Sequence, residues 1–333
     1  MKQSIRDFIL PVIITFVSSV LITPLVGKIA TNLEIVAKPN PLVKTHKTAT
    51  PYLGGIAVYV SMFVGLIFSS AFNSYISLFL CIGLMMVLGL YDDLRPLSPL
   101  TKLLGQILIS IVGIFLVLNA NDGQINLFEF FLYLFWLVLA TNAFNLIDVM
   151  DGLATGISAL AFGGLFLIAG FRGFDDLGIA FLLICAALLG FLPSNFYRAR
   201  IFLGDAGSLM IGFSFGLLTL AEFKFRNQTN TLPIVFLLFA IPFFELVFVF
   251  VRRSFAGKHF WKGSCDHFSL RLLSIGWKVP KIVLISYIIG AFLLFIALIF
   301  EFLSPLILRW LIMLPAIFLA LWIWKYLSKI EVE

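Results

Sequence analysis

Aspartates beside long apolar segments are the residues of this sequence best suited to chemistry. The chain has only 17 acidic residues among 333. Five of them border apolar runs, namely Asp92, Asp93, Asp148, Asp151 and Asp205. A carboxylate is costly at the edge of a membrane-length run and is therefore a functional hypothesis. Because hard divalent cations prefer carboxylate, amide and phosphate oxygens, these residues predict a divalent-cation site.

Asp92 and Asp93 are adjacent at the end of one apolar run. Two neighbouring carboxylates cannot both ionise cheaply unless a cation neutralises them. The alternative interpretation is a solvated pair of acids in a loop. Lys102 follows at the start of the next run, where it is either an ordinary positive anchor or a residue that reaches a phosphate.

A second cluster places polar residues every three positions, at Asn142, Asn145 and Asp148. Residues three apart are neighbours on a helix, so these three side chains can share a face. Each step also drifts around the axis, so Asp151 would point away unless the helix breaks near Gly152. The alternative is a polar seam, because buried Asn side chains bond across helices.

Asp205 lies between Gly204 and Gly207, just before another apolar run. The glycines allow a ligand to approach the backbone closely, but Asp205 is equally suited to capping the following helix. A polar stretch near the C-terminus contains His267 and Arg271. A lone histidine is more often structural than catalytic, whereas a basic loop with Arg suits an anionic sugar nucleotide.

The composition predicts an all-α polytopic integral membrane protein. Hydrophobic residues make up 61% of the chain, charged residues make up 12%, and the mean hydropathy is +1.09. Soluble domains carry about 25% charged residues. The long unbroken apolar runs argue against a membrane β-barrel, whose strands alternate over about ten residues. The net charge of +6 is explained by basic loops at a membrane and predicts no nucleic-acid partner.

Long apolar runs predict the membrane-spanning helices that position the polar residues described above. A span needs about 20 apolar residues, so the chain has room for about ten or eleven spans in one transmembrane domain, residues 1–333. The runs are 8–30, 52–71, 74–91, 103–119, 127–145, 153–171, 177–193, 206–222, 232–252, 280–300 and 303–326.

Charge sets the expected orientation. With the first span beginning outside, most Lys and Arg residues fall in cytoplasmic loops, as the positive-inside rule requires. All five aspartates then lie on the cytoplasmic side. We therefore expect a multi-pass protein of the cell membrane with a single site on its cytoplasmic face.

Together, these clusters resemble the polyprenyl-phosphate N-acetylhexosamine-1-phosphate transferases, glycosyltransferase family 4. The sequence Asn142-Ala-Phe-Asn145-Leu-Ile-Asp148-Val-Met-Asp151-Gly-Leu resembles the family's Asn-Ala-x-Asn-x-x-Asp-Gly-x-Asp-Gly-Leu, with Val where the family has its first Gly. Phe202-Leu-Gly-Asp-Ala-Gly-Ser is similar to the family's Phe-Met-Gly-Asp-x-Gly-Ser. The resemblance also covers residues 38–40, 46–47, 51–55 and 266–273.

The resemblance implies a reaction in which a polyprenyl phosphate attacks the β-phosphorus of a UDP-N-acetylhexosamine and UMP leaves. Mg²⁺ (or Mn²⁺) would bridge the diphosphate, held at positions that match Asn145 and Asp205. Asp92 and Asp93 match an acidic pair that positions or deprotonates the lipid phosphate. Asp92, Asp93 and Asp205 are thus the expected catalytic residues, and Lys102 matches a phosphate-contacting lysine.

The resemblance also implies a nucleotide pocket. Asn195 and Phe202 match positions that hold the uracil end, and Asp148 and Asp151 complete the pocket. A homodimer is expected from the resemblance as well. The expected substrate contacts are Lys47, Lys102, Asn142, Asp148, Asp151, Asn195, Phe202, His267 and Arg271.

The last loop departs from the family pattern. It keeps His267 and Arg271 but has Ser269 and Leu270 where histidines often stand. Its Arg-Leu-Leu ending is closer to the undecaprenyl-phosphate N-acetylglucosaminyl 1-phosphate transferases than to the phospho-N-acetylmuramoyl-pentapeptide transferases, which stay open as an alternative. Two other classes also stay open: a secondary transporter, and a family member that has lost activity and acts as a scaffold.

Overall fold

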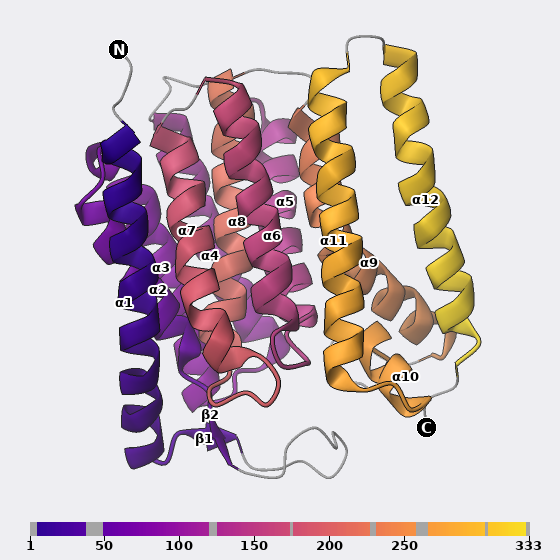
Figure 1. Ribbon diagram of the computed structural model, residues 1–333, viewed down its shortest axis with the longest axis horizontal. Helices are drawn as coiled ribbons and strands as arrows, with labels where there is room; N and C mark the ends of the chain where they lie inside the picture. Colours follow the sequence, from indigo (N-terminus) through magenta and orange to yellow (C-terminus); the bar gives the residue numbers. More distant parts are fainter. Residues whose placement is uncertain are drawn as a thin grey trace.

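The computed structural model describes residues 5–37, 49–119, 125–173, 176–226, 231–257, 266–303 and 306–330. These residues form a bundle of roughly parallel and antiparallel helices with one small two-stranded sheet (Figure 1). The elements are α1 (Ile5–Asn32), β1 (Val36–Ala37), β2 (Thr50–Pro51), α2 (Gly54–Ile67), α3 (Phe72–Leu94), α4 (Pro99–Asn119), α5 (Leu127–Leu146), α6 (Leu153–Phe171), α7 (Asp176–Asn195), α8 (Gly204–Arg226), α9 (Thr231–Phe255), α10 (Phe268–Ser274), α11 (Val279–Phe302) and α12 (Leu306–Ser328).

In the described part of the chain, 10 helices are long and apolar enough to cross a membrane. The prediction of a polytopic helical membrane protein is therefore confirmed. The run predicted over 52–71 forms a shorter helix, α2, of 14 residues. The next helix, α3, begins at Phe72, and Ser74 in its first turn donates a hydrogen bond of 2.9 Å to Asp176 at the start of α7.

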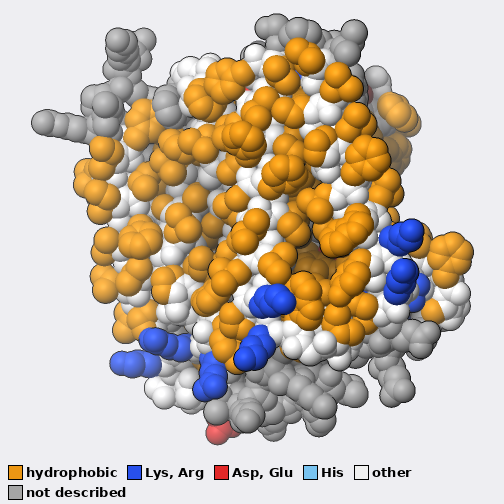
Figure 2. Space-filling model, turned by 45° about the vertical axis from the view of Figure 1, so that its right-hand side comes forward, with side chains coloured by type: hydrophobic (Ala, Val, Ile, Leu, Met, Phe, Trp, Pro, Cys, Tyr) orange, Lys and Arg blue, Asp and Glu red, His pale blue; other side chains and the backbone are white. Residues whose placement is uncertain are grey.

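The middle of the bundle is occupied by α8, which is the most enclosed of the spanning helices. It packs chiefly against α3 and α5, while α6 packs on α7 (Figure 1). Phe215 of α8 anchors an aromatic cluster, with ring centroids 5.3 Å from Phe144 and 5.6 Å from Phe239. The face of the molecule shown in Figure 2 is broadly apolar, and Lys and Arg side chains lie in its lower half.

Close backbone packing fixes the N-terminal end of α8. The Gly54 N–H donates to the Phe202 carbonyl at 3.0 Å, and the Phe202 N–H donates to the Pro51 carbonyl at 2.8 Å. A Cβ on Gly55 would lie 2.2 Å from the Gly207 nitrogen, so glycine is required there. β1 and β2 pair through Val36–Pro51 and Ala37–Thr50 and hold this segment at the lower end of the bundle in Figure 1.

A buried ion cluster joins four helices at the opposite end. Arg172, just after α6, donates to both carboxylate oxygens of Glu301 in α11, each at 2.7 Å. It also donates to Glu222 of α8 and to Thr231 of α9, each at 3.0 Å. This cluster fixes one end of α8, and the packing of Gly55 on Gly207 fixes the other.

Arg172→Met should destabilise the protein strongly. Removing one partner of a buried ion pair costs about 3–5 kcal/mol, because the remaining charges stay buried. We expect a lower thermal midpoint for the purified protein in detergent. Lys281→Met is the control, since Lys281 is exposed above the Trp277 ring and its loss should change the midpoint little. Equal midpoints for Arg172→Met and the unmodified protein would contradict the stabilising role.

Candidate active site

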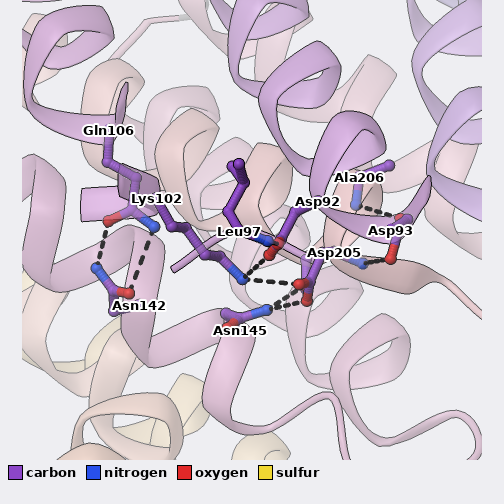
Figure 3. A network of polar contacts seen from close by, with 10 residues as sticks. Asp92, Asp93, Leu97, Lys102, Gln106, Asn142, Asn145, Asp205 and Ala206 are labelled. Carbon is purple, nitrogen blue, oxygen red and sulfur yellow. Dashed lines mark hydrogen bonds and ion pairs between the residues drawn. The ribbon is translucent and has the colours of Figure 1, made fainter. Parts of the chain in front are cut away.

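Four helix ends meet around the amino group of Lys102 (Figure 3). The Lys102 Nζ lies 2.8 Å from Asp92 Oδ2, at the end of α3, and 2.7 Å from Asp205 Oδ2, at the start of α8. Asn145, at the end of α5, donates from Nδ2 to Asp205 Oδ1 at 2.7 Å. The structure therefore brings together four of the residues predicted from separate sequence clusters.

A short turn between α3 and α4 places Lys102 over Asp92. The Leu97 N–H donates to Asp92 Oδ1 at 2.6 Å, which closes the chain back after α3 ends at Leu94. Pro99 then begins α4, as expected for a residue whose fixed φ suits the first helical turn. Lys102 consequently points back along the same face as Asp92.

Asp93 turns away from Asp92 and caps α8. Its Oδ1 accepts the Asp205 N–H at 2.9 Å and its Oδ2 accepts the Ala206 N–H at 2.9 Å (Figure 3). The first N–H groups of a helix lack partners within the helix, and a carboxylate there is favoured by the helix dipole. A Cβ on Gly89 would lie 2.3 Å from the Asp205 carbonyl oxygen, so α3 and α8 touch closely here. Asp205 lies inside α8, and the cap comes from α3 instead.

Asn145 and Asn142 share the inner face of α5 but have different partners. Asn145 Nδ2 also donates to Ser208 Oγ at 2.8 Å, within the site. Asn142 Nδ2 donates to Gln106 Oε1 of α4 at 2.7 Å, and Gln106 is only 1% exposed. Asn142 thus lies in a polar seam that joins α4 to α5. Sequence reasoning missed Gln106, although it lies one helical turn after Lys102.

The connection between α5 and α6 holds the next two aspartates. α5 ends at Leu146 and Gly152 caps α6 with a φ of 78°, so the helix breaks before Asp148 and Asp151. Asp148 therefore lies beyond α5 and does not share its helical face with Asn142 and Asn145 as expected. Burial raises the pKa of Asp148 well above its ordinary value, and the nearby charges of Asp205, Asp93 and Asp151 add to this. These effects favour the protonated, neutral form of the Asp148 carboxyl.

Comparison with known proteins decides the family. The sequence model of glycosyl transferase family 4 matches residues 75–222, which carry Asp92, Lys102, Asn145 and Asp205. A phospho-N-acetylmuramoyl-pentapeptide-transferase of Staphylococcus aureus (strain JH9) is 30% identical over 312 residues, 85% of this chain and 94% of the relative. The chain belongs to glycosyl transferase family 4.

Other relatives of this family 4 chain carry both branch names. A probable undecaprenyl-phosphate N-acetylglucosaminyl 1-phosphate transferase of Bacillus subtilis (strain 168) is 29% identical over 289 residues, 84% of this chain and 80% of the relative. A phospho-N-acetylmuramoyl-pentapeptide-transferase of Staphylococcus saprophyticus is 29% identical over 310 residues, 85% of this chain and 94% of the relative. The predicted family is confirmed.

In this family 4 chain, two residues of the predicted nucleotide pocket, Asn195 and Asp151, form hydrogen bonds with the backbone of residues 199–201. Asn195 is buried, accepts the Thr155 hydroxyl at 2.7 Å, and donates to the Ile201 carbonyl at 3.0 Å. Phe202 is partly exposed. Asp151 is 6% exposed and accepts the Ala199 N–H at 3.1 Å. These contacts tie residues 196–203 to the start of α6.

His267 and Arg271 lie in a separate polar cluster at the lower end of the bundle (Figure 1). His267 Nδ1 lies 2.7 Å from Glu245 Oε1, a fully buried carboxylate of α9 that sequence reasoning missed. Arg271 is 2% exposed and donates to Asp266 Oδ1 at 2.7 Å and to the Ile330 carbonyl. Neither side chain joins the hydrogen-bonded group around Lys102. The structure thus gives both residues structural partners, while Lys47 lies outside the described residues.

The residues around Lys102 fit a hard divalent cation. Asp92 and Asp205 supply carboxylate oxygens and Ser208 supplies a hydroxyl oxygen, which are donors that Mg²⁺ prefers, while Asn145 presents its Nδ2 group to Asp205 and Ser208. No group of three or more His, Cys, Asp and Glu side chains in the described chain is arranged as a metal site. Mg²⁺ commonly binds through one or two carboxylates and substrate phosphates, which this donor set allows.

Proposed function

We propose that this family 4 protein transfers an N-acetylhexosamine 1-phosphate, with N-acetylglucosamine as the sugar, from a UDP-sugar to a polyprenyl phosphate. UMP is the leaving product, and a lipid-diphosphate-linked sugar for cell-envelope glycans is the other product. The observation that carries the proposal is the placement of Lys102 between Asp92 and Asp205 at the end of a membrane helix bundle.

The chemistry of that arrangement follows from charge. The two phosphate groups must approach each other, so their repulsion is a large part of the barrier. Lys102 would bind the phosphate oxygens and reduce that repulsion. Mg²⁺, held by Asp205 and Asn145, would add charge neutralisation of the diphosphate. The Asp93 cap keeps the Asp205 carboxylate facing Lys102.

Asp92 acts in this proposal as a positioning group more than as a base. A phosphate monoester has a second pKa near 6, so the lipid phosphate is largely dianionic at neutral pH. Such a nucleophile needs little further deprotonation. Asp92 instead forms an ion pair with Lys102, at 2.8 Å. It would thereby hold the Lys102 amino group where the lipid phosphate binds.

The location of the site suits a reaction between a lipid and a water-soluble nucleotide. Asp92, Lys102, Asn145 and Asp205 all stand at helix ends, on the side of the bundle where β1 and β2 lie. Lys and Arg also gather toward this lower side (Figure 2). By the positive-inside rule this supports a cytoplasmic site in the cell membrane.

Two donor sugars are supported by the relatives and the last loop. The Bacillus subtilis relative and the Arg-Leu-Leu ending of α10 support N-acetylglucosamine. The Staphylococcus relatives, at up to 30% identity, support the phospho-N-acetylmuramoyl-pentapeptide reaction as the second candidate. Both candidates release UMP, so the identity of the donor separates them.

The test is a UMP-release assay of the purified full-length protein with undecaprenyl phosphate and a panel of UDP-sugars. We expect UMP from UDP-N-acetylglucosamine only when the lipid phosphate and Mg²⁺ are both present, and none after chelation with EDTA. UMP release with UDP-muramoyl-pentapeptide as donor, and with no other UDP-sugar of the panel, would support the second candidate. No product with any donor, or sugar-nucleotide uptake into proteoliposomes without UMP, would contradict a transferase.

A further inference from the structure

A tyrosine of α11 contacts the start of α6, the helix against which α11 packs. The Tyr287 hydroxyl donates to the Gly152 carbonyl oxygen at 2.6 Å. The same carbonyl accepts the Gly156 N–H at 2.9 Å, so both of its acceptor positions are used. Neither Tyr287 nor Gly156 belongs to the sequence clusters that predicted the site.

The space for the tyrosine ring is made by a glycine. A Cβ on Gly156 would lie 2.1 Å from atoms of the Tyr287 ring and hydroxyl, a distance that real side chains do not tolerate. Gly152 itself has a φ of 78°, where a side chain would be strained, and its Cβ would lie 3.3 Å from the Tyr287 hydroxyl. The Tyr287 ring therefore fits against the start of α6 only because residues 152 and 156 are glycines.

Gly152 ends the segment that brings two aspartates to the site. Residues 147–152 connect α5, which ends just after Asn145, to α6. Asp148 in this segment is close enough to Asp205 for their charges to interact. Asp151, next to Gly152, holds residues 196–203 through the Ala199 N–H. A displacement of the Gly152 carbonyl would consequently shift the segment on which Asp148 and Asp151 lie.

We propose that Tyr287 is a positioning residue that holds the 147–152 segment in place for the nucleotide end of the UDP-sugar. The inference rests on the proposed function, because that function supplies the nucleotide. In this proposal α11 contributes to nucleotide binding through Tyr287 without touching the substrate itself. The lipid phosphate binds at Lys102 in the proposed function, so its affinity should not depend on Tyr287.

The chain offers a matched control in Tyr59. The Tyr59 hydroxyl of α2 donates to the Phe79 carbonyl of α3 at 3.1 Å. A Cβ on Gly83, four residues after Phe79, would lie 2.3 Å from that hydroxyl. The two tyrosines therefore make the same contact, a hydroxyl to a helix carbonyl over a glycine, but Tyr59 does so away from the 147–152 segment.

The experiment compares Tyr287→Phe and Tyr59→Phe in the purified full-length protein, with UMP as the probe. We expect the Kd of UMP, measured by calorimetry, to rise about five- to tenfold in Tyr287→Phe and to stay unchanged in Tyr59→Phe. The KM of the UDP-sugar should rise by the same factor, with the KM of the polyprenyl phosphate unchanged. Similar small decreases in the thermal midpoint of both variants would show that each has lost one hydrogen bond.

Gly156→Ala provides an independent route to the same effect, because its methyl group would push the Tyr287 ring away. The double variant should bind UMP no more weakly than either single variant. An unchanged Kd in Tyr287→Phe, or an equal rise in Tyr59→Phe, would overturn the positioning role. If the unmodified protein does not bind UMP, the proposed function itself is wrong, and the inference with it.

Discussion

Asp205→Asn should reduce the rate of UMP release by about a hundred- to a thousandfold. The substitution keeps the size of the side chain but removes the charge that pairs with Lys102 at 2.7 Å and that would bind Mg²⁺. The amide also places an N–H₂ group where Asn145 and Lys102 now donate hydrogen bonds. The measurement is the initial rate at saturating UDP-sugar and lipid phosphate, over a range of Mg²⁺ concentrations.

Asp176→Asn is the matched control for this substitution. Asp176 also lies in the first turn of a spanning helix, α7, but at the other end of the bundle, where Ser74 donates to it at 2.9 Å. Its substitution should leave the rate of UMP release unchanged. Robust turnover by Asp205→Asn, or turnover that needs no divalent metal, would contradict the site assignment.

Asp93→Ala should be the second most damaging substitution, reducing kcat by about a hundredfold. The reason is geometric, because Asp93 accepts the N–H groups of Asp205 and Ala206 and thereby fixes the start of α8. Loss of a helix cap also costs about 0.5–2 kcal/mol of stability. The measurements are kcat and the thermal midpoint of the same preparation.

Asp93→Asn distinguishes two roles of Asp93, capping α8 and removing a proton from the lipid phosphate. The amide oxygen can still accept one of the two N–H groups, so we expect this variant to keep clearly more activity than Asp93→Ala. A residue that removes a proton from the lipid phosphate would lose its function equally in both variants. Equal inactivity of the Asn and Ala variants, with unchanged thermal midpoints, would therefore show that the charge of Asp93 acts directly.

The helices and the central part of the site were predictable from local signals. Long apolar runs predict spanning helices because every backbone polar group in lipid must be satisfied within its own segment. The three-residue spacing predicts a helical face shared by Asn142, Asn145 and Asp148, and this holds for the two asparagines, whereas α5 ends at Leu146, before Asp148. Lys102 and Asp205 were predictable because charged residues beside such runs are few.

Side-chain direction was not predictable, because it depends on how helices cross. Asp92 and Asp93 look equivalent in the sequence, yet only the approach of α8 to Gly89 decides which of them caps it. The same holds for Asn142, whose partner Gln106 lies 36 residues away on another helix. Contacts such as Tyr287 to Gly152 span 135 residues and leave no local pattern.

The partners of the last polar loop were not part of the sequence prediction. The resemblance predicts His267 and Arg271 near the sugar and phosphates, which stays a prediction, and the structure pairs them with Glu245 and with Asp266. A signal for the pairing with Glu245 was present in the sequence. Glu245 is an isolated acid in the middle of an apolar run, and such a charge needs a buried partner.

The enclosure of α8 has a consequence for how the protein responds to its bilayer. A helix that contacts lipid tilts or shifts when the hydrocarbon thickness changes, at a cost of fractions of a kcal/mol per Å. α8 is shielded by its neighbours and is pinned near Asp205 at one end and at Glu222 at the other. Thickness changes would therefore be absorbed by peripheral helices such as α12. The spacing between Asp205 and Lys102 should consequently hold across membranes of different lipid composition.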